Sequence, residues 1–185
     1  MSDRINVRDA HFTDAAAIGR VHIDCWRSTY AGLLSEKMLV NLSHANYQNQ
    51  WQRHLLGRSG RKHYIYVAEH ETMGVVGFVS GGNVRNSVLD HKSEIYALYL
   101  LDEFRGFGCG RILFRCLAKR LYRKCGSRLM VWVLSANPSR YFYEAMGGQI
   151  IATRYEAMGG SEFQMTAYGW TDVDELVSAY PPQNL

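Results

Sequence analysis

The chain has 185 residues, of which 47% are hydrophobic, and its 21 Lys and Arg against 17 Asp and Glu give a formal net charge of +4. This length and hydrophobic content predict one domain, residues 1–185, with a substantial core. The charge excess suits a polyanionic cofactor, but it is too small and too diffuse to indicate a nucleic-acid-binding protein.

A cytoplasmic protein with reduced thiols is expected. The N-terminal residues are charged where a signal peptide needs an apolar segment, and no run approaches the roughly 18 apolar residues of a membrane span. The four cysteines form no C-x-x-C pair and the seven histidines show no H-x-x-x-H spacing. We therefore expect no disulfide, no metal site and no membrane partner.

Helices dominate the first third of the chain, after a short strand near the N-terminus. Thr13 or Asp14 precedes a segment whose apolar residues recur at helical spacing, which predicts a capped amphipathic helix. Two shorter helices follow, one beginning at Ser35 or Glu36 and the other around Trp51.

The strands predicted in this half form an antiparallel sheet. They cover 4–9, 63–70 and 74–80, and the last two form a hairpin. Residues 81–83, Gly-Gly-Asn, are predicted to be a turn, and 86–92 a polar loop.

The segment 93–124 reads as a strand, a glycine-rich turn and a helix. An apolar and aromatic run over 95–101 has the length of a buried strand and ends in charged residues. The glycines that follow lie directly before a basic amphipathic helix; they are Gly106, Gly108 and Gly110. Because the first-turn amides of a helix lack internal partners and carry the positive end of its dipole, they can bind an anion. With Arg105 and Arg111 on either side, the turn predicts a diphosphate ligand.

Two other phosphate-binding loops fit poorly. In a dinucleotide fingerprint the third glycine of G-x-G-x-x-G would fall on Arg111 or Leu113, depending on the starting glycine. In a P-loop, Gly110 would be followed by Lys and then Ser or Thr, whereas Arg and Ile stand there. A nucleotide-dependent oxidoreductase is accordingly a weak alternative.

The last third begins with another buried strand over 128–134, predicted to run parallel to the central strand. Asn137 then caps a short helix, Pro138 occupies its first turn and Gly147 ends it. Two strands over 148–170 meet at Gly159-Gly160. Thr171 is expected to cap a final helix before Pro181-Pro182.

Two stretches in this order resemble the GNAT N-acetyltransferases. R-G-F-G-C-G, from Arg105 to Gly110, matches the R/Q-x-x-G-x-G/A signature of that family, and the preceding E-I-Y-A-L-Y-L is similar to its central strand. The Asn-led helix with F-Y-E and a closing glycine follows in the family's order, with Gly148 where an apolar residue is usual. The resemblance covers essentially the whole chain. It implies an α/β fold of the α+β kind, in which a central twisted, mostly antiparallel sheet has parallel fourth and fifth strands that splay apart.

The resemblance also implies a cofactor and residues that bind it. In GNAT enzymes the glycine-rich loop holds the pyrophosphate of acetyl-CoA, and free backbone N–H groups of the splayed central strand bind the acetyl oxygen and pantetheine. The implied cofactor-binding residues are Tyr99, Leu100, Arg105, Gly106, Phe107, Gly108, Gly110, Arg111 and Asn137.

Two residues are candidates for proton transfer. Tyr143 resembles the family tyrosine that protonates the CoA sulfur, and with an ordinary pKa near 10 it would be protonated at neutral pH. Glu94, at the start of the central strand, stands where several members carry a glutamate that deprotonates the amine. The alternatives are a buried packing tyrosine and a surface carboxylate.

The sequence indicates less about the site that binds the acceptor than about the cofactor site. Trp26, Tyr30 and Tyr96 are the candidate substrate-binding residues, and core packing is the alternative for Trp26 and Tyr30. Because aromatic faces attract cations and a carboxylate can accept a proton, we expect a small cationic amine. Polyamines, aminoglycosides, amino acids and protein N-termini are all compatible with the sequence.

The predicted activity is transfer of the acetyl group of acetyl-CoA to a primary amine of a small molecule or peptide by direct attack. The alternative is a non-catalytic acyl-CoA-binding regulator with the same fold, which would not need Tyr143 or Glu94. The oligomeric state, including a homodimer, is left open.

Overall fold

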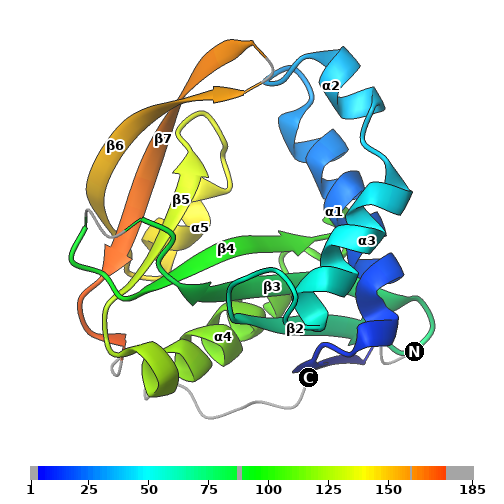
Figure 1. Ribbon diagram of the computed structural model, residues 1–185, viewed down its shortest axis with the longest axis horizontal. Coiled ribbons are helices and arrows are strands. Elements are labelled where there is room, and N and C mark those ends of the chain that lie inside the picture. Colours follow the sequence, from blue (N-terminus) through cyan, green and yellow to red (C-terminus); the bar gives the residue numbers. More distant parts are fainter. Residues whose placement is uncertain (1–3, 87–88, 159, 174–185) are drawn as a thin grey trace.

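The computed structural model describes residues 4–86, 89–158 and 160–173. They form a seven-stranded mixed sheet of order β1-β2-β3-β4-β5-β7-β6 (Figure 1). The strands are β1 (Ile5–Asp9), β2 (His63–His70), β3 (Gly74–Asn83), β4 (Ser93–Leu100), β5 (Leu129–Leu134), β6 (Gln149–Met158) and β7 (Ser161–Trp170). The helices are α1 (Ala15–Tyr30), α2 (Glu36–Val40), α3 (His44–Leu55), α4 (Cys109–Cys125) and α5 (Arg140–Ala145). The expected helix after Thr171 lies almost entirely outside the described residues.

The strand directions confirm the predicted fold. β1 to β4 pair antiparallel, β4 and β5 pair parallel, and β5, β7 and β6 continue antiparallel. A parallel pair needs a crossover connection, and α4 supplies it between β4 and β5.

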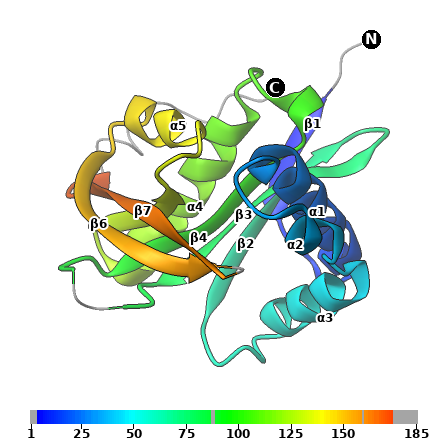
Figure 2. The same ribbon diagram turned by 90° about the horizontal axis from the view of Figure 1, so that it is seen from above.

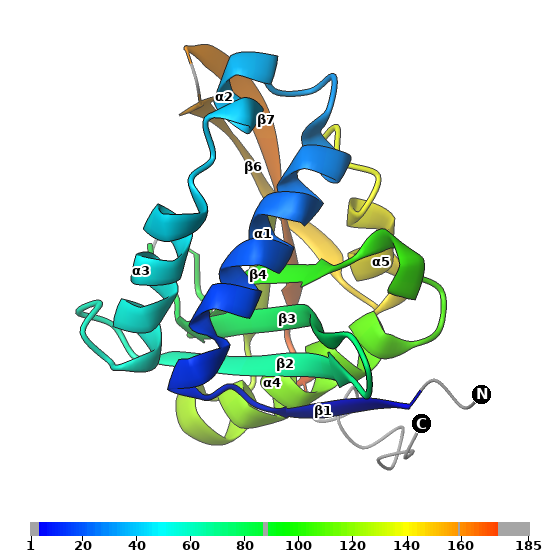
Figure 3. The ribbon, with the colours of Figure 1, turned by 90° about the vertical axis from the view of Figure 1, so that its right-hand side faces the viewer.

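Helices cover both faces of the sheet (Figures 2 and 3). On one face α1 and α3 bury a cluster that includes Ile18, Val21 and Phe78. On the other face α4 and α5 bury a larger cluster that includes Leu113 and Leu117. Burying a Leu, Ile or Phe side chain contributes about 1.5 to 3 kcal/mol, so these two layers hold the central strands in place.

His22 of α1 is half-buried on the α1/α3 face among aromatic rings. Its ring stacks on that of Tyr99 at 4.9 Å between centroids and meets Tyr47 edge-on at 4.7 Å. The Nδ1 atom is buried without a hydrogen-bond partner. Burial disfavours the charged imidazolium and lowers the pKa of His22 to about 3.

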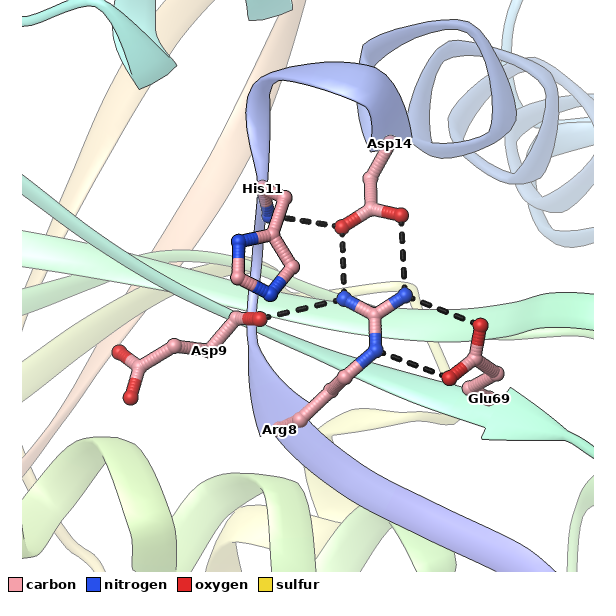
Figure 4. A network of polar contacts seen from close by, with 5 residues as sticks. All are labelled: Arg8, Asp9, His11, Asp14 and Glu69. Carbon is pink, nitrogen blue, oxygen red and sulfur yellow. Dashed lines mark hydrogen bonds and ion pairs between the residues drawn. The ribbon is translucent and has the colours of Figure 1, made fainter.

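The first strand is fastened to the sheet and to α1 by Arg8 (Figure 4). Its guanidinium donates two hydrogen bonds to Asp14, at 2.8 and 3.0 Å, and two to Glu69 on β2, at 2.9 and 3.0 Å. Asp14 also accepts the backbone N–H of His11 at 2.7 Å. The bonds from Arg8 lower the pKa of the Asp14 carboxyl, so the chain entering α1 is held by a bidentate ion pair at neutral pH.

One local prediction is wrong. Gly81, Gly82 and Asn83 continue β3 and pair with β4 rather than forming a turn. A Cβ on Gly82 would approach the Lys62 carbonyl oxygen to 2.3 Å, so glycine is required here for close strand packing. The predicted cap at Asn137 is confirmed, because its side-chain oxygen accepts the Ser139 backbone N–H at 2.8 Å, and the regular helix α5 begins at Arg140.

Candidate active site

The sheet opens between its two parallel strands. β4 and β5 pair only at their first residues, and the last pair is Ile95 with Val131. On its other edge β4 stays paired with β3 as far as Leu100. Beyond Ile95, β4 therefore presents one edge without a partner strand, as predicted for splayed strands.

A cavity of about 640 Å³ passes through this opening. On the α4/α5 face it is lined by residues of the glycine-rich loop and of α5, and on the α1 face by residues of α1 and of the β6–β7 hairpin. The lining residues used below are Trp26, Tyr30, Arg85, Tyr96, Leu98, Tyr99, Leu100, Arg105, Gly106, Gly108, Gly110, Arg111, Trp132, Asn137, Tyr143, Arg154, Glu156, Met158 and Met165.

The glycine-rich loop lies at the mouth on the α4/α5 face. Gly106 and Gly108 have positive φ angles of 87° and 86°, which disfavour any residue with a side chain. A Cβ on either would meet nothing within 4 Å, so both backbones border free space. Gly108 is the N-cap of the 17-residue helix α4, whose first amides adjoin the cavity.

The residues next to these glycines differ in their contacts and in whether they line the cavity. Arg105 forms an ion pair with Asp102 at 2.7 Å and donates to the Leu100 carbonyl at 3.3 Å. Arg111 lines the cavity from the first turn of α4. Phe107 is 69% exposed and its side chain does not line the cavity.

The register of β4 determines which of its amides face the opening. The Leu101 N–H donates to the Val76 carbonyl on β3 at 2.9 Å. Because antiparallel residues alternate between bonded and non-bonded pairs, the Tyr99 N–H also points to β3, whereas those of Leu98 and Leu100 point to the opening. The backbone donors nearest the predicted position are thus Leu98 and Leu100, and Tyr99 lines the cavity with its side chain.

Hydroxyl groups meet in the middle of the cavity. The Trp26 indole N–H donates to the Tyr99 hydroxyl at 2.8 Å, and Tyr30 interacts through its hydroxyl with Tyr99 and Asn137. Tyr143, from α5, is 7% exposed and lines the same space. Burial raises the pKa of the Tyr30, Tyr99 and Tyr143 phenols, which keeps all three protonated at neutral pH.

Glu94 lies apart from this group. Its side chain is 1% exposed and does not line the cavity. The carboxylate accepts the Arg85 backbone N–H at 2.9 Å and the Arg85 Nε–H at 2.9 Å, and it also pairs with Nη2. Tyr96, two residues on, does line the cavity, and its hydroxyl donates to the Asn83 carbonyl.

Four charged or aromatic lining residues escaped the sequence analysis: Arg85, Trp132, Arg154 and Glu156. The two on β6 alternate with exposed residues, which was a signal for a strand with one covered face. What lies against that face depends on the order of the strands in the sheet, which the sequence does not show.

The comparisons with known proteins agree with this geometry. Residues 75–157 match the family model described as FR47-like protein. The Bacillus subtilis (strain 168) protein named uncharacterized N-acetyltransferase YuaI is 32% identical over 173 residues, which are 93% of this chain and 96% of that protein. This chain belongs to the GNAT N-acetyltransferases.

Solved structures show the same GNAT fold. The PaiA N-acetyltransferase of Thermoplasma acidophilum, in complex with coenzyme A, has a TM-score of 0.66 at 21% identity, and the match covers 90% of this chain and 98% of that one. The Salmonella typhimurium protein yncA, solved with its cofactor acetyl-CoA, has a TM-score of 0.62 at 21% identity, covering 92% and 95%. Within the described residues of this GNAT protein, no helix has the length and apolar character to cross a membrane.

Proposed function

We propose that this GNAT enzyme transfers the acetyl group of acetyl-CoA to a primary amine of a small molecule or peptide by direct attack. The observation that supports this most is the cavity through the β4–β5 opening, with an anion-binding loop at one mouth and a second mouth on the opposite face. Because residues from α1 to β7 line this one space, we also propose that residues 1–185 act as one catalytic domain.

The residues at the first mouth fit acetyl-CoA. Gly106 and Gly108 leave room for phosphate oxygens against the backbone, and the start of α4 supplies free amides with a favourable dipole. Arg105 and Arg111 add positive charge beside them, and the unpaired edge of β4 offers hydrogen-bonding groups to an extended arm. PaiA with coenzyme A and yncA with acetyl-CoA support this choice of cofactor.

Acetyl-CoA would supply an activated thioester, and the chain supplies the groups around it. We assign the Leu98 and Leu100 amides to the acetyl oxygen, where preorganised donors stabilise developing negative charge. Tyr143 is assigned as the proton donor to the departing sulfur. Its buried phenol is protonated at neutral pH, and Tyr30 and Asn137 support the wall beside it.

Direct attack is favoured over a covalent acetyl-enzyme. In the part of the chain that the structure describes, none of the four cysteines lines the cavity. Burial raises the pKa of the Cys25 and Cys109 thiols, which disfavours the nucleophilic thiolate.

Glu94 can act as the proton acceptor only if Arg85 releases it. Three N–H groups of Arg85 occupy its carboxylate, and the side chain lies behind the cavity wall. We therefore propose that Glu94 mainly anchors Arg85, with a catalytic role dependent on a movement of the Arg85 segment.

A panel of amines tests this function through CoA release. Purified protein with acetyl-CoA is assayed against amino acids, polyamines, aminoglycosides and short peptides, and the acetylated product is identified by mass. We expect product from at least one class. A protein that binds CoA tightly but acetylates no amine of any class would instead be the non-catalytic acyl-CoA-binding regulator.

A further inference from the structure

We propose that the acceptor is a zwitterion, an α-amino acid with an apolar side chain, whose carboxylate binds Arg154 and whose amino group faces Glu156. This inference rests on the proposed function, because it assigns the second mouth of the same cavity to the acceptor. It differs from the small cationic amine expected from the sequence.

The wall at the second mouth is formed by the inner face of β6. Side chains alternate between the faces of a strand, so Arg154, Glu156 and Met158 point to the same side. All three line the cavity, whereas Tyr155 between them is 68% exposed. β6 therefore presents one cation, one anion and one apolar group to the acceptor.

Arg154 is positioned to bind a carboxylate. Its guanidinium lies over the Trp132 ring, 4.0 Å from the centroid, and one terminal nitrogen pairs with Glu156. The Nε atom is buried and has no hydrogen-bond partner. A guanidinium held over an aromatic ring is restrained in position, and its remaining N–H groups can bind a carboxylate through charge-assisted hydrogen bonds.

Arg85 does not compete for this role. Its guanidinium lies over the Tyr96 ring at 5.1 Å, and its Nε and Nη2 atoms are taken by the buried Glu94. Charges of opposite sign follow one another from the buried Glu94 to Arg85, Glu156 and Arg154, and the last three line the cavity. Glu156 is close enough to Arg85 to favour its charged form.

The balance of charge argues against a polycation. Among the described residues, the lining includes four arginines, two at each mouth, and one carboxylate, Glu156. A polyamine would bring further positive charge to Arg85 and Arg154 with only Glu156 to receive it. In a zwitterion the carboxylate would meet Arg154 and the ammonium group would meet Glu156, so each charge has a partner of opposite sign.

The rest of this mouth is apolar. Trp132, Met158 and Met165 line it, and Leu34 contributes from the segment before α2. Such a surface suits an aliphatic, thioether or aromatic side chain. In the transfer step the ammonium gives one proton to the Glu156 carboxylate, and the neutral amine forms the N–C bond as the C–S bond breaks. The N-protonated amide then gives its extra proton to solvent, and the sulfur takes the proton of Tyr143. Exchange with solvent afterwards returns a proton to Tyr143 and removes the proton from Glu156.

Binding of matched acceptors to the CoA-saturated protein tests this inference without requiring turnover. Calorimetry compares leucine, methionine and phenylalanine with their amides, which differ only in the carboxylate. We expect at least one amino acid to bind 10-fold or more tightly than its amide. The calorimetry is run near pH 6.5, below the ordinary α-amino pKa of about 7.7 to 8.0, so that both the acid and its amide carry an ammonium group and the comparison reports on the carboxylate.

Substitutions on β6 then show which residue causes the preference for the amino acid over its amide. Arg154→Met should abolish the preference for the carboxylate, and Arg154→Lys should restore part of it. Tyr155→Ala, the neighbour with an exposed side chain, should leave the preference unchanged. Melting temperatures confirm that each variant is folded.

The outcomes separate this inference from the proposed function. Acetylation of simple amines with equal binding of acid and amide would overturn the zwitterion assignment and leave the acetyltransferase intact. Preference for the acid that depends on Arg154, in a protein that releases no CoA with any amine, would support the binding site and refute the proposed function. If no amino acid binds at all, or if Arg154→Met retains the preference, the assignment is wrong.

Discussion

Replacing Gly108 by alanine tests the glycine-rich loop most sharply. Gly108 has φ of 86° and borders free space at the N-terminus of α4. A left-handed conformation costs a residue with a Cβ roughly 1 to 2 kcal/mol, so Gly108→Ala should lower the melting temperature by about 2 to 8 °C. The same methyl group would occupy the space that a phosphate oxygen needs.

The expected loss of cofactor affinity follows from the hydrogen bonds affected. A hydrogen bond to a charged group contributes about 1.5 to 3 kcal/mol, so losing one amide–phosphate bond should weaken CoA binding by roughly 10- to 100-fold. Titration calorimetry with CoA measures this loss directly.

Gly110→Ala is the matched control, two residues further along in the first turn of α4, where alanine keeps the backbone N–H. A Cβ at Gly110 would meet Phe142 at 3.6 Å, which is ordinary van der Waals contact, and Gly110 is already helical. We expect CoA affinity within about threefold of wild type, which is under 1 kcal/mol, and no loss of stability. If Gly108→Ala, while folded, binds CoA as tightly as Gly110→Ala does, the loop does not hold the phosphates.

Three further changes test other parts of the site and fold. Tyr143→Phe should lower kcat by roughly 10- to 100-fold with little change in acetyl-CoA affinity, and an unchanged kcat under rate-limiting chemistry would leave Tyr143 as a packing residue. Glu94→Gln should leave the pH–rate profile unchanged and lower the melting temperature, because the amide weakens the contact with Arg85; a profile displaced to higher pH would restore Glu94 as the base. His22 has a folded pKa of about 3, below the usual 6.5, so protonation of the unfolded chain should destabilise the protein as pH falls below 6.5. In denaturant titrations, the free energy of unfolding of the wild type should fall by about 2 kcal/mol more between pH 7.5 and pH 5 than that of His22→Phe. An equal fall in both proteins would refute this.

The parts of this fold that depend on neighbouring residues were predictable. The strand, turn and helix around Gly106 and Gly108 follow from hydrophobic periodicity and glycine placement, and the structure places the loop at a cavity mouth. The hairpin over His63–His70 and the following strand likewise follow from local alternation.

The features that depend on contacts between distant residues could not be predicted from the sequence. The sequence shows Glu94 at the start of a strand, but only the structure shows Arg85 occupying its carboxylate. The alternation of Arg154 and Glu156 is visible in the sequence, yet their place in the cavity wall depends on the position of β6 next to β7. Gly82 resembles a turn residue in the sequence, because the contact that requires glycine there, the close approach of the Lys62 carbonyl just before β2, comes from a distant part of the chain.

The central claim is that acetyl-CoA binds through the loop from Arg105 to Arg111, and a thermal unfolding experiment tests it most directly. Acetyl-CoA at 100 times its dissociation constant should stabilise the protein by about 2.7 kcal/mol, which corresponds to a rise in melting temperature of roughly 5 to 11 °C. NAD and ATP at the same concentration should give no rise. No shift with acetyl-CoA, or an equal shift with NAD, would contradict the account.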